Sequence, residues 1–266
     1  MRDDASSPPA SADELTHRPS TGPIFIGTSG WVYRTWRAHL YGKIPMRRWL
    51  ATASRAFDTL EINGSFYTQI SEVTYARWYA ETPADFRFAL KGHRFVTHYK
   101  RLRDCRDSIL RLRDQSAPLG DKLAAVLWQL PSHFPLDLER LADFLRALRA
   151  WPIRHTLELR HASWFIPAVA DRLRDAHVGV CLGDAPDFPM WRAVTSDFVY
   201  VRLHGHTRKY ASRYSLASLR RWAASARAWA ASGHDVFIYF DNDAEGHAVR
   251  NARELRAMIA KQEAEF

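Results

Sequence analysis

Short runs of apolar residues recur along the chain, and each is followed by turn residues and then by a segment with helical spacing. Val, Ile, Leu, Phe and Tyr dominate these runs, which predicts strands, whereas apolar positions three and four residues apart predict helices. The eight predicted strands cover residues 24–30, 59–63, 87–92, 124–130, 155–160, 179–184, 198–205 and 235–242.

Helix-like segments lie between these strands. Ser71 and Asp137 open two of them, and Gly233 follows the end of another, as helix termini require. Two crossovers depart from the regular repeat: the long basic segment 100–114, and 183–194, where prolines leave room only for a short helix. The other predicted helices cover 44–57, 71–82, 137–151, 168–178, 215–232 and 246–263.

The repeated alternation of strand and helix predicts the α/β class, with a parallel sheet and right-handed crossovers. Closure into a single (β/α)₈ TIM barrel over residues 23–266 is the economical arrangement. An open doubly wound sheet is the alternative, but "GTSGWVY" after the first strand is neither GxGxxG nor GxxxxGK[ST]. Residues 1–22, rich in Ser, Pro and Ala and without an apolar core, predict a disordered tail.

The amino-acid composition indicates a cellular location but does not identify a binding partner. Two distant cysteines, Cys105 and Cys181, provide neither a disulfide framework nor a zinc ribbon, and no apolar run reaches 18 residues. We therefore expect a cytoplasmic protein with no membrane contact and no obligate protein partner. The net charge of +9 permits a nucleic-acid partner but does not indicate one, because much of the excess arginine is mixed with aspartate on helices.

Polar residues stand at the carboxyl end of every predicted strand. Applying the two-residue period of a strand sends Leu60 and Ile62 outward and turns Glu61 inward, and the same alternation applies to the other strands. Because barrels carry their sites where the strands' carboxyl ends open, this mouth is the predicted ligand site. The residues predicted to face it are Ser29, Glu61, Asn63, Lys91, Gln129, Glu158, Arg160, Asp184, Arg202, His204 and Asp241 or Asn242.

This ring alternates in sign, which favours an anionic ligand over a metal cage, because interposed Lys and Arg oppose bound cations. We predict no metal site and no cofactor. Lys91, Arg160 and Arg202 would hold a phosphate or carboxylate of a small polar ligand. Glu61 and Glu158 would orient the arginines or act as base, and His98 or His204 would be the general acid or base. Whether any reaction occurs stays open.

Three alternatives stay open beside this prediction. A metal-dependent phosphodiesterase or endonuclease-like barrel would use the histidines and carboxylates. A glycoside hydrolase would use Glu61 and Glu158, although Arg160 should lower the pKa of Glu158 and disfavour it as an acid. A nucleic-acid-binding protein without catalysis would use the basic residues 100–113 and aromatic residues near the mouth. Those aromatic residues are Trp31, Tyr33, Trp36, Phe66, Tyr67, Trp164, Phe165, Tyr210 and Tyr214, which could instead pack loops over the barrel. Residues 206–215 could form a lid.

The segments "GTSGWVYRTW", "EINGSFY", "FALKGHRFVTH", "LWQLPSHF", "LELRHASWF", "YVRLHG" and "YFDNDAEGHAVRNA" together resemble, in order, the motifs of the domain-of-unknown-function-72 (YecE-like) family. The resemblance covers about residues 24–256. It implies a TIM barrel whose activity is unassigned; nucleic-acid binding has been suggested for the family only from the shape of endonuclease and sugar-isomerase barrels. The site residues that it implies are Ser29, Trp31, Glu61, Asn63, Phe66, Tyr67, Lys91, His98, Gln129, Glu158, Arg160, His161, Trp164, Arg202, His204 and Asn242. Asp241 departs from the family pattern, which has asparagine there.

Overall fold

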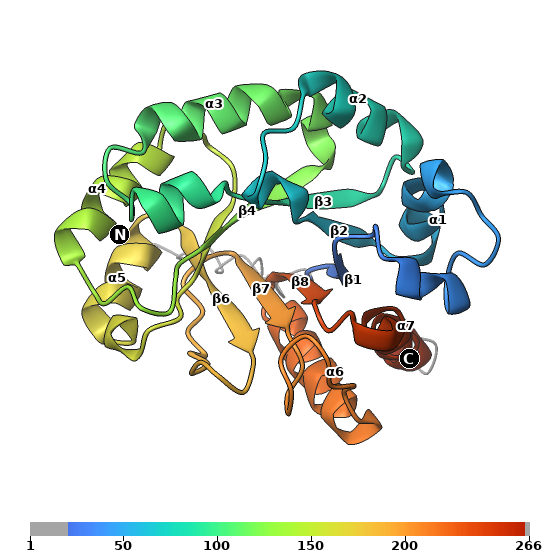
Figure 1. Ribbon diagram of the computed structural model, residues 1–266. Coiled ribbons are helices and arrows are strands. Elements are labelled where there is room, and N and C mark those ends of the chain that lie inside the picture. The colour runs from blue at the N-terminus through green and yellow to red at the C-terminus, as the bar shows by residue number, and fades with distance from the viewer. Residues whose placement is uncertain (1–20, 264–266) are drawn as a thin grey trace, which may run out of the picture.

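The protein is a closed barrel of eight parallel strands, shown by a computed structural model that describes residues 21–263 (Figure 1). Each strand pairs with the next along the chain, and β8 closes the barrel against β1. This confirms the predicted fold class and the number and order of the strands. The strands are β1 (Ile24–Ser29), β2 (Thr59–Ile62), β3 (Arg87–Lys91), β4 (Leu123–Gln129), β5 (His155–Glu158), β6 (Val178–Asp184), β7 (Phe198–Leu203) and β8 (Asp235–Phe240).

Helices surround the barrel on the outside (Figure 1). Ser71 and Asp137 are N-caps, as predicted, and Ser215 is a third. Each side chain accepts a hydrogen bond from the backbone N–H three residues on. A 3-10 turn over Met46–Arg48 precedes the first helix, so that helix begins later than its sequence pattern suggests. The helices are α1 (Trp49–Ala56), α2 (Glu72–Glu81), α3 (Arg106–Ser116), α4 (Leu138–Leu148), α5 (Pro167–Asp175), α6 (Leu216–Ala231) and α7 (His247–Glu263).

The crossovers that follow β3 and β6 are irregular, as the sequence predicted, but the second lacks the helix that was expected in it. The crossover from β3 to α3 begins with a π-helical turn over Phe95–Tyr99, a feature that is frequent at functional sites. The crossover from β6 to β7, described throughout residues 185–197, contains no helix, so the predicted short helix is wrong. Pro186 and Pro189 lack a backbone N–H, and the segment makes only an isolated bridge between Ala185 and Phe188.

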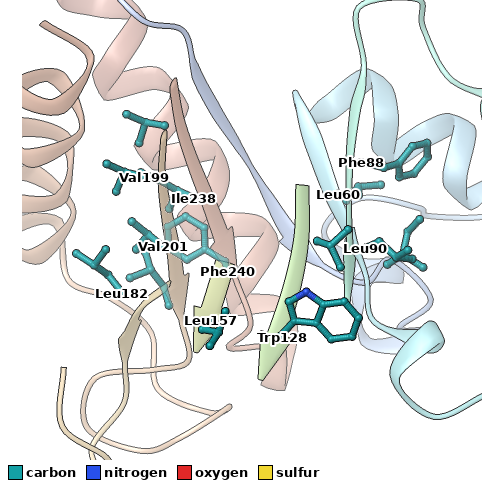
Figure 2. Packing of buried hydrophobic residues seen from close by; sticks show 14 of the residues in the cluster. Leu60, Phe88, Leu90, Trp128, Leu157, Leu182, Val199, Val201, Ile238 and Phe240 are labelled. Atoms are coloured by element: carbon teal, nitrogen blue, oxygen red, sulfur yellow. The ribbon is translucent and has the colours of Figure 1, made fainter. Parts of the chain in front are cut away.

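The apolar residues form two layers that the strands separate. The outer layer packs the strands against the helices, and Figure 2 shows labelled members of it, including Leu60, Trp128 and Ile238. The inner layer fills the lower part of the lumen with Ala89, Ala125, Leu127, Cys181, Phe198, Tyr200, Phe237 and Tyr239. Since the lower lumen is closed by these side chains, the polar strand ends form a floor at one mouth of the barrel.

The predicted disordered tail, residues 1–22, lies almost entirely outside the described residues. Among residues 21–263, no helix has the length and apolar character needed to cross a bilayer.

Candidate functional site

Arg202 on β7 lies at the centre of a buried ion-pair network at the carboxyl end of the barrel. Its Nε and Nη2 donate to Oε2 and Oε1 of Glu61 at 3.0 and 2.8 Å. Nη1 donates to Oε2 of Glu158 at 2.9 Å, and Nη2 also donates to Oδ2 of Asp241 at 3.0 Å. The side chain of Arg202 has no exposed surface, so the network supplies the hydrogen bonds that water would otherwise provide.

Strand register brings these side chains together. Ser29 pairs with Glu61 between β1 and β2, and Gln129 pairs with Glu158 between β4 and β5. On β6 the inward position beside Arg202 is Gly183. A Cβ on Gly183 would come within 2.8 Å of the ring of Phe188, so the missing side chain leaves room at the mouth. The predicted inward direction of Glu61, Glu158, Arg202 and Ser29 thus follows from the two-residue period.

Glu61 is fully engaged by its neighbours. Besides the two bonds from Arg202, it accepts from Ser29 Oγ at 2.6 Å and from the hydroxyl of Tyr200 at 2.7 Å. The residue has no exposed surface. Neither oxygen is therefore free to take a proton from a ligand, and the contacts give Glu61 the role of holding Arg202.

Glu158 links the buried network to the surface of the mouth. Its Oε1 accepts from Nε and Nη2 of Arg160 at 3.0 and 2.7 Å, and it lies 3.0 Å from Nε2 of His204. Burial opposes ionisation, but the charges of Arg160 and Arg202 hold the pKa of Glu158 well below its usual range. Glu158 is therefore an ionised anchor for Arg160, whose own side chain stacks on Phe188, 4.7 Å from that ring's centre.

His204 and Asp241 close the network on the side of β7 and β8. His204 Nε2 lies 3.2 Å from Arg202 Nη1, and its Nδ1 lies 3.0 Å from Asp241 Oδ2 without the alignment of a hydrogen bond. Although burial acts against it, the charge of Arg202 lowers the pKa of Asp241 to about 2. The rings of Phe188 and Tyr210 lie edge-on to His204, each with its centre 5.6 Å away, so they cover the imidazole.

Lys91 is the cation of the ring that lacks a carboxylate partner. Its Nζ lies 4.3 Å from the centre of the Phe66 ring, and Phe66 in turn packs edge-on against His98 at 5.1 Å. Burial and the charge of Arg202 lower the pKa of Lys91 to about 8. Burial and the cations Arg160 and Lys91 lower the pKa of His98 to about 4, so its imidazole is neutral near pH 7.

Sequence reasoning missed Asp243, Tyr200 and Phe188. Burial and the charge of Asp241 raise the pKa of Asp243 well above its usual range, so both favour the protonated form of this carboxyl. Its position two residues beyond Asp241 was a usable signal, as was the position of Tyr200 two residues before Arg202. Phe188 carries no such signal, because its loop follows no strand or helix periodicity.

Several predicted site residues lie away from this network. Asp184 faces outward on β6 and approaches His206 at 3.2 Å, so its predicted place in the ring is wrong: Gly183 takes the inward position. Asn242 is likewise turned away and donates to the carbonyl of Ser212, whereas Asp241 faces the network. Three other residues have partners outside the network: Trp31 packs against Trp78, Trp164 donates to the Phe134 carbonyl, and His161 pairs with Ser163. Tyr67 is 59% exposed. Asn63 follows β2, and its buried Oδ1 has no hydrogen-bond partner among the described residues.

Most of the aromatic residues predicted near the mouth are core residues. Trp36 and Tyr214 are buried, and Phe165 stacks on Trp191. Residues 206–215 contain no helix or strand, as their sequence suggested, and Tyr210 from this segment reaches His204. Closure of the segment over a ligand stays a prediction.

The charges of the network balance. Three carboxylates, Glu61, Glu158 and Asp241, stand against three cations, Lys91, Arg160 and Arg202. Within residues 21–263, no group of three or more His, Cys, Asp or Glu side chains is arranged to hold a metal ion.

Sequence and structure comparisons agree on the relatives of this chain. UPF0759 protein YunF of Bacillus subtilis is 25% identical over 274 residues, which cover 89% of this chain and 94% of that protein. UPF0759 protein YecE of Escherichia coli K12 is 28% identical over 144 residues, 53% of this chain and 50% of YecE. The crystal structure of a DUF72 family protein from Thermotoga maritima matches with a TM-score of 0.81 at 25% identity, covering 90% of this chain and 99% of that one.

A DUF72 family protein from Enterococcus faecalis, 19% identical, has the same fold with a TM-score of 0.76, over 89% of this chain and 95% of that one. The sequence profile described as "Protein of unknown function DUF72" matches residues 25–266. The motifs, the barrel and these matches together show that the chain belongs to the DUF72 family of TIM-barrel proteins, whose function is unassigned.

Proposed function

We propose that the protein is a metal-independent barrel that binds a small phosphate- or carboxylate-bearing ligand between Lys91 and Arg160. The observation that carries this proposal is the division of the charges at the mouth. The guanidinium of Arg202 donates hydrogen bonds to Glu61, Glu158, Asp241 and Ser29. Arg202 has no exposed surface. Arg160 and Lys91 lie nearer the surface and keep donors that no described carboxylate takes.

Arg160 has one half of its guanidinium committed and one half free. Nε and Nη2 donate to Glu158, whereas Nη1 makes no hydrogen bond or ion pair with any of residues 21–263. Because Glu158 and Phe188 hold the guanidinium plane, little side-chain entropy would be lost when an anion binds to it. We assign Arg160 and Lys91 to the ligand and Arg202 to their support.

The pairing of the carboxylates supports a metal-independent site. Glu61, Glu158 and Asp241 already accept from arginines, and a bound cation would have to displace those guanidinium groups. Asp243, whose pKa is raised by burial and by the charge of Asp241, and the neutral His98 lie near the same mouth. They give proton-transfer groups for a reaction, should the ligand be a substrate.

Phosphate and glycolate are suitable probes for this site. We expect each to bind wild-type protein in calorimetric or NMR titrations, and expect Arg160→Gln and Lys91→Met each to weaken binding by roughly tenfold or more, the loss of one charge-assisted hydrogen bond. Arg154→Gln is the matched control, since Arg154 pairs with Asp197 and Asp235 at the opposite end of the barrel. Unchanged affinity in both mouth variants would contradict the proposal. Native mass spectrometry of freshly purified protein would identify a bound ligand directly.

A second candidate, single-stranded nucleic-acid binding without catalysis, has one specific observation in its favour. Phe95 and Tyr99 are 45% and 63% exposed on the π-helical turn, with Lys100 and Arg94 stacked on them at 5.5 and 5.1 Å. Exposed aromatic rings beside cations provide stacking surfaces for bases. This candidate requires oligonucleotide affinity that falls steeply with salt and is lost in Tyr99→Ala, while Lys91→Met leaves it unchanged. Affinity that is flat with salt would remove it.

A further inference from the structure

Lys91 occupies an unusual position for a lysine. It ends β3, is 4% exposed, and makes no hydrogen bond or ion pair with any of residues 21–263 in the described structure. Its Nζ is not among the polar atoms that are both enclosed and unpartnered, so solvent reaches it from the mouth. A buried ammonium without an acceptor is costly, and such a group is retained mainly where it has a function.

Lys122 provides an internal comparison. It is also 4% exposed, but its Nζ donates to the Tyr79 carbonyl at 2.6 Å and to the Thr82 carbonyl at 2.8 Å. The barrel therefore buries one lysine with its donors satisfied and another without acceptors. The two residues have the same exposed fraction, and they differ in the acceptors that surround each amine.

The surroundings of Lys91 favour the free amine. Burial disfavours the ammonium, and the charge of Arg202 acts in the same direction. Glu61, Glu158 and Asp241 oppose this only in part, because Arg202 engages all three carboxylates. The Phe66 ring covers one side of the amine. With a pKa of about 8, roughly one Lys91 in ten is unprotonated at pH 7, against fewer than roughly one in a thousand for an ordinary lysine. The free amine, and not the ammonium, is the nucleophile.

We propose that Lys91 forms an imine with the carbonyl group of a small anionic aldehyde or ketone, whose phosphate or carboxylate is held by Arg160. This rests on the anion site proposed above and goes beyond it by naming a covalent step and a class of ligand. The nitrogen lone pair attacks the carbonyl carbon, and a C=N double bond finally replaces the C=O double bond. The two amine protons and the carbonyl oxygen leave as one water molecule.

Reductive trapping with glyoxylate, the simplest aldehyde that carries a carboxylate, tests the proposal. The full chain is incubated at pH 7 with glyoxylate and cyanoborohydride, which delivers hydride to the imine carbon while solvent protonates the nitrogen. Peptide mapping then compares Lys91 with buried Lys122 and exposed Lys43. Acetaldehyde is the probe without a carboxylate, and glycolate is the competitor without a carbonyl.

We expect glyoxylate to label Lys91 roughly tenfold or more above Lys122, with labelling that rises with pH and levels off above about 8. Lys91→Met should remove this label and leave that on Lys43 unchanged. Arg160→Gln should reduce labelling by glyoxylate but not by acetaldehyde.

The two proposals fail in different ways. If glycolate binds but Lys91 is labelled no more than Lys122, the imine is wrong and the anion site stands. If acetaldehyde labels Lys91 as well as glyoxylate does, and glycolate neither binds nor competes, the anionic ligand is wrong although the amine is reactive.

Discussion

Arg202 and Glu61 face each other across the barrel from β7 and β2, and two parallel hydrogen bonds of 3.0 and 2.8 Å join them. Neither residue has exposed surface. A buried charge without its partner would strongly destabilise the folded protein, so each residue is needed to compensate the buried charge of the other. Because Arg202 and Glu61 bind each other and are enclosed, neither is available for direct contact with a ligand. The charged groups left for that role are Arg160 and Lys91.

Arg202→Met should be strongly destabilising. It leaves Glu61, Glu158 and Asp241 buried without their shared cation, and the loss of one partner from a buried pair typically costs about 3–5 kcal/mol. Urea denaturation at pH 7 measures the change in the free energy of unfolding.

Arg256→Met is the control for that experiment. Arg256 pairs with Asp58 at 2.7 Å, but the two side chains are 38% and 31% exposed, so we expect a loss of about 1 kcal/mol or less. Equal losses in the two variants would show that enclosure by three carboxylates is not what makes Arg202 important.

Tyr200→Phe tests the hydrogen bond that Glu61 accepts from the tyrosine hydroxyl inside the barrel. The Tyr200 hydroxyl donates to Glu61 Oε2 at 2.7 Å, and a hydrogen bond to a charged group contributes about 1.5–3 kcal/mol. Tyr239→Phe, on the neighbouring strand, removes a hydroxyl that pairs with the uncharged Thr59 at 2.8 Å, for about 0.5–1.5 kcal/mol. Thermal or urea denaturation should rank Tyr200→Phe as the more damaging change. The opposite ranking would mean that the carboxylate does not depend on this donor.

The sequence was sufficient to predict the barrel, because strand periodicity and helix capping are local. Leu60 and Leu157 pack outward and Glu61 and Glu158 point inward, as alternation along a strand requires. The same rule failed at the end of β6, where Gly183 rather than Asp184 takes the inward position. An inward glycine has no side chain to mark it, so the polar neighbour was chosen in its place.

The sequence could not predict which charged residues are enclosed and which are available to a ligand. Arg160 and Arg202 are both arginines near the carboxyl end of a predicted strand, and only the contacts show that Arg202 is enclosed and that Arg160 is half free. Likewise, the raised pKa of Asp243 depends on its burial and on the charge of Asp241, both of which arise from the loop after β8. Pairings between distant strands decide these roles, and periodicity carries no information about them.

Asp243→Asn and Asp241→Asn should change stability in opposite directions. Asp243 has a raised pKa in the folded protein. Its contribution to the free energy of unfolding is therefore fully present below about pH 4 and is lost as the pH rises through the folded pKa. Asp243→Asn should therefore stabilise the protein at pH 8 and change little at pH 4. Asp241, with a pKa of about 2, contributes stability above about pH 4 that is lost as the pH falls through about 2.

Asp241→Asn should accordingly destabilise the protein at pH 8. Urea denaturation of both variants at pH 4, 6 and 8 measures the two effects. A destabilising Asp243→Asn at pH 8 would indicate that the Asp243 carboxyl is ionised in the folded protein and has a cationic partner.

Lys91→Met should make the protein more stable. The pKa of Lys91 falls from 10.5 to about 8 on folding, which corresponds to about 3 kcal/mol of destabilisation by the charged form below pH 8. Because the folded pKa is the lower one, the wild-type protein recovers this stability as the pH rises from about 8 to above 10, and loses it again on acidification. Methionine has a similar shape and no charge to bury.

Lys122→Met should have the opposite effect, since it leaves the Tyr79 and Thr82 carbonyls without their donor, at about 1–3 kcal/mol. Urea denaturation at pH 7 should place Lys91→Met above and Lys122→Met below the wild type, and the gain from Lys91→Met should shrink toward pH 10. A protein that sacrifices stability to keep an unpartnered amine at its mouth is consistent with a function for that amine. Destabilisation by Lys91→Met at pH 7 would show instead that the ammonium has a structural acceptor, and would remove the basis for its reactivity.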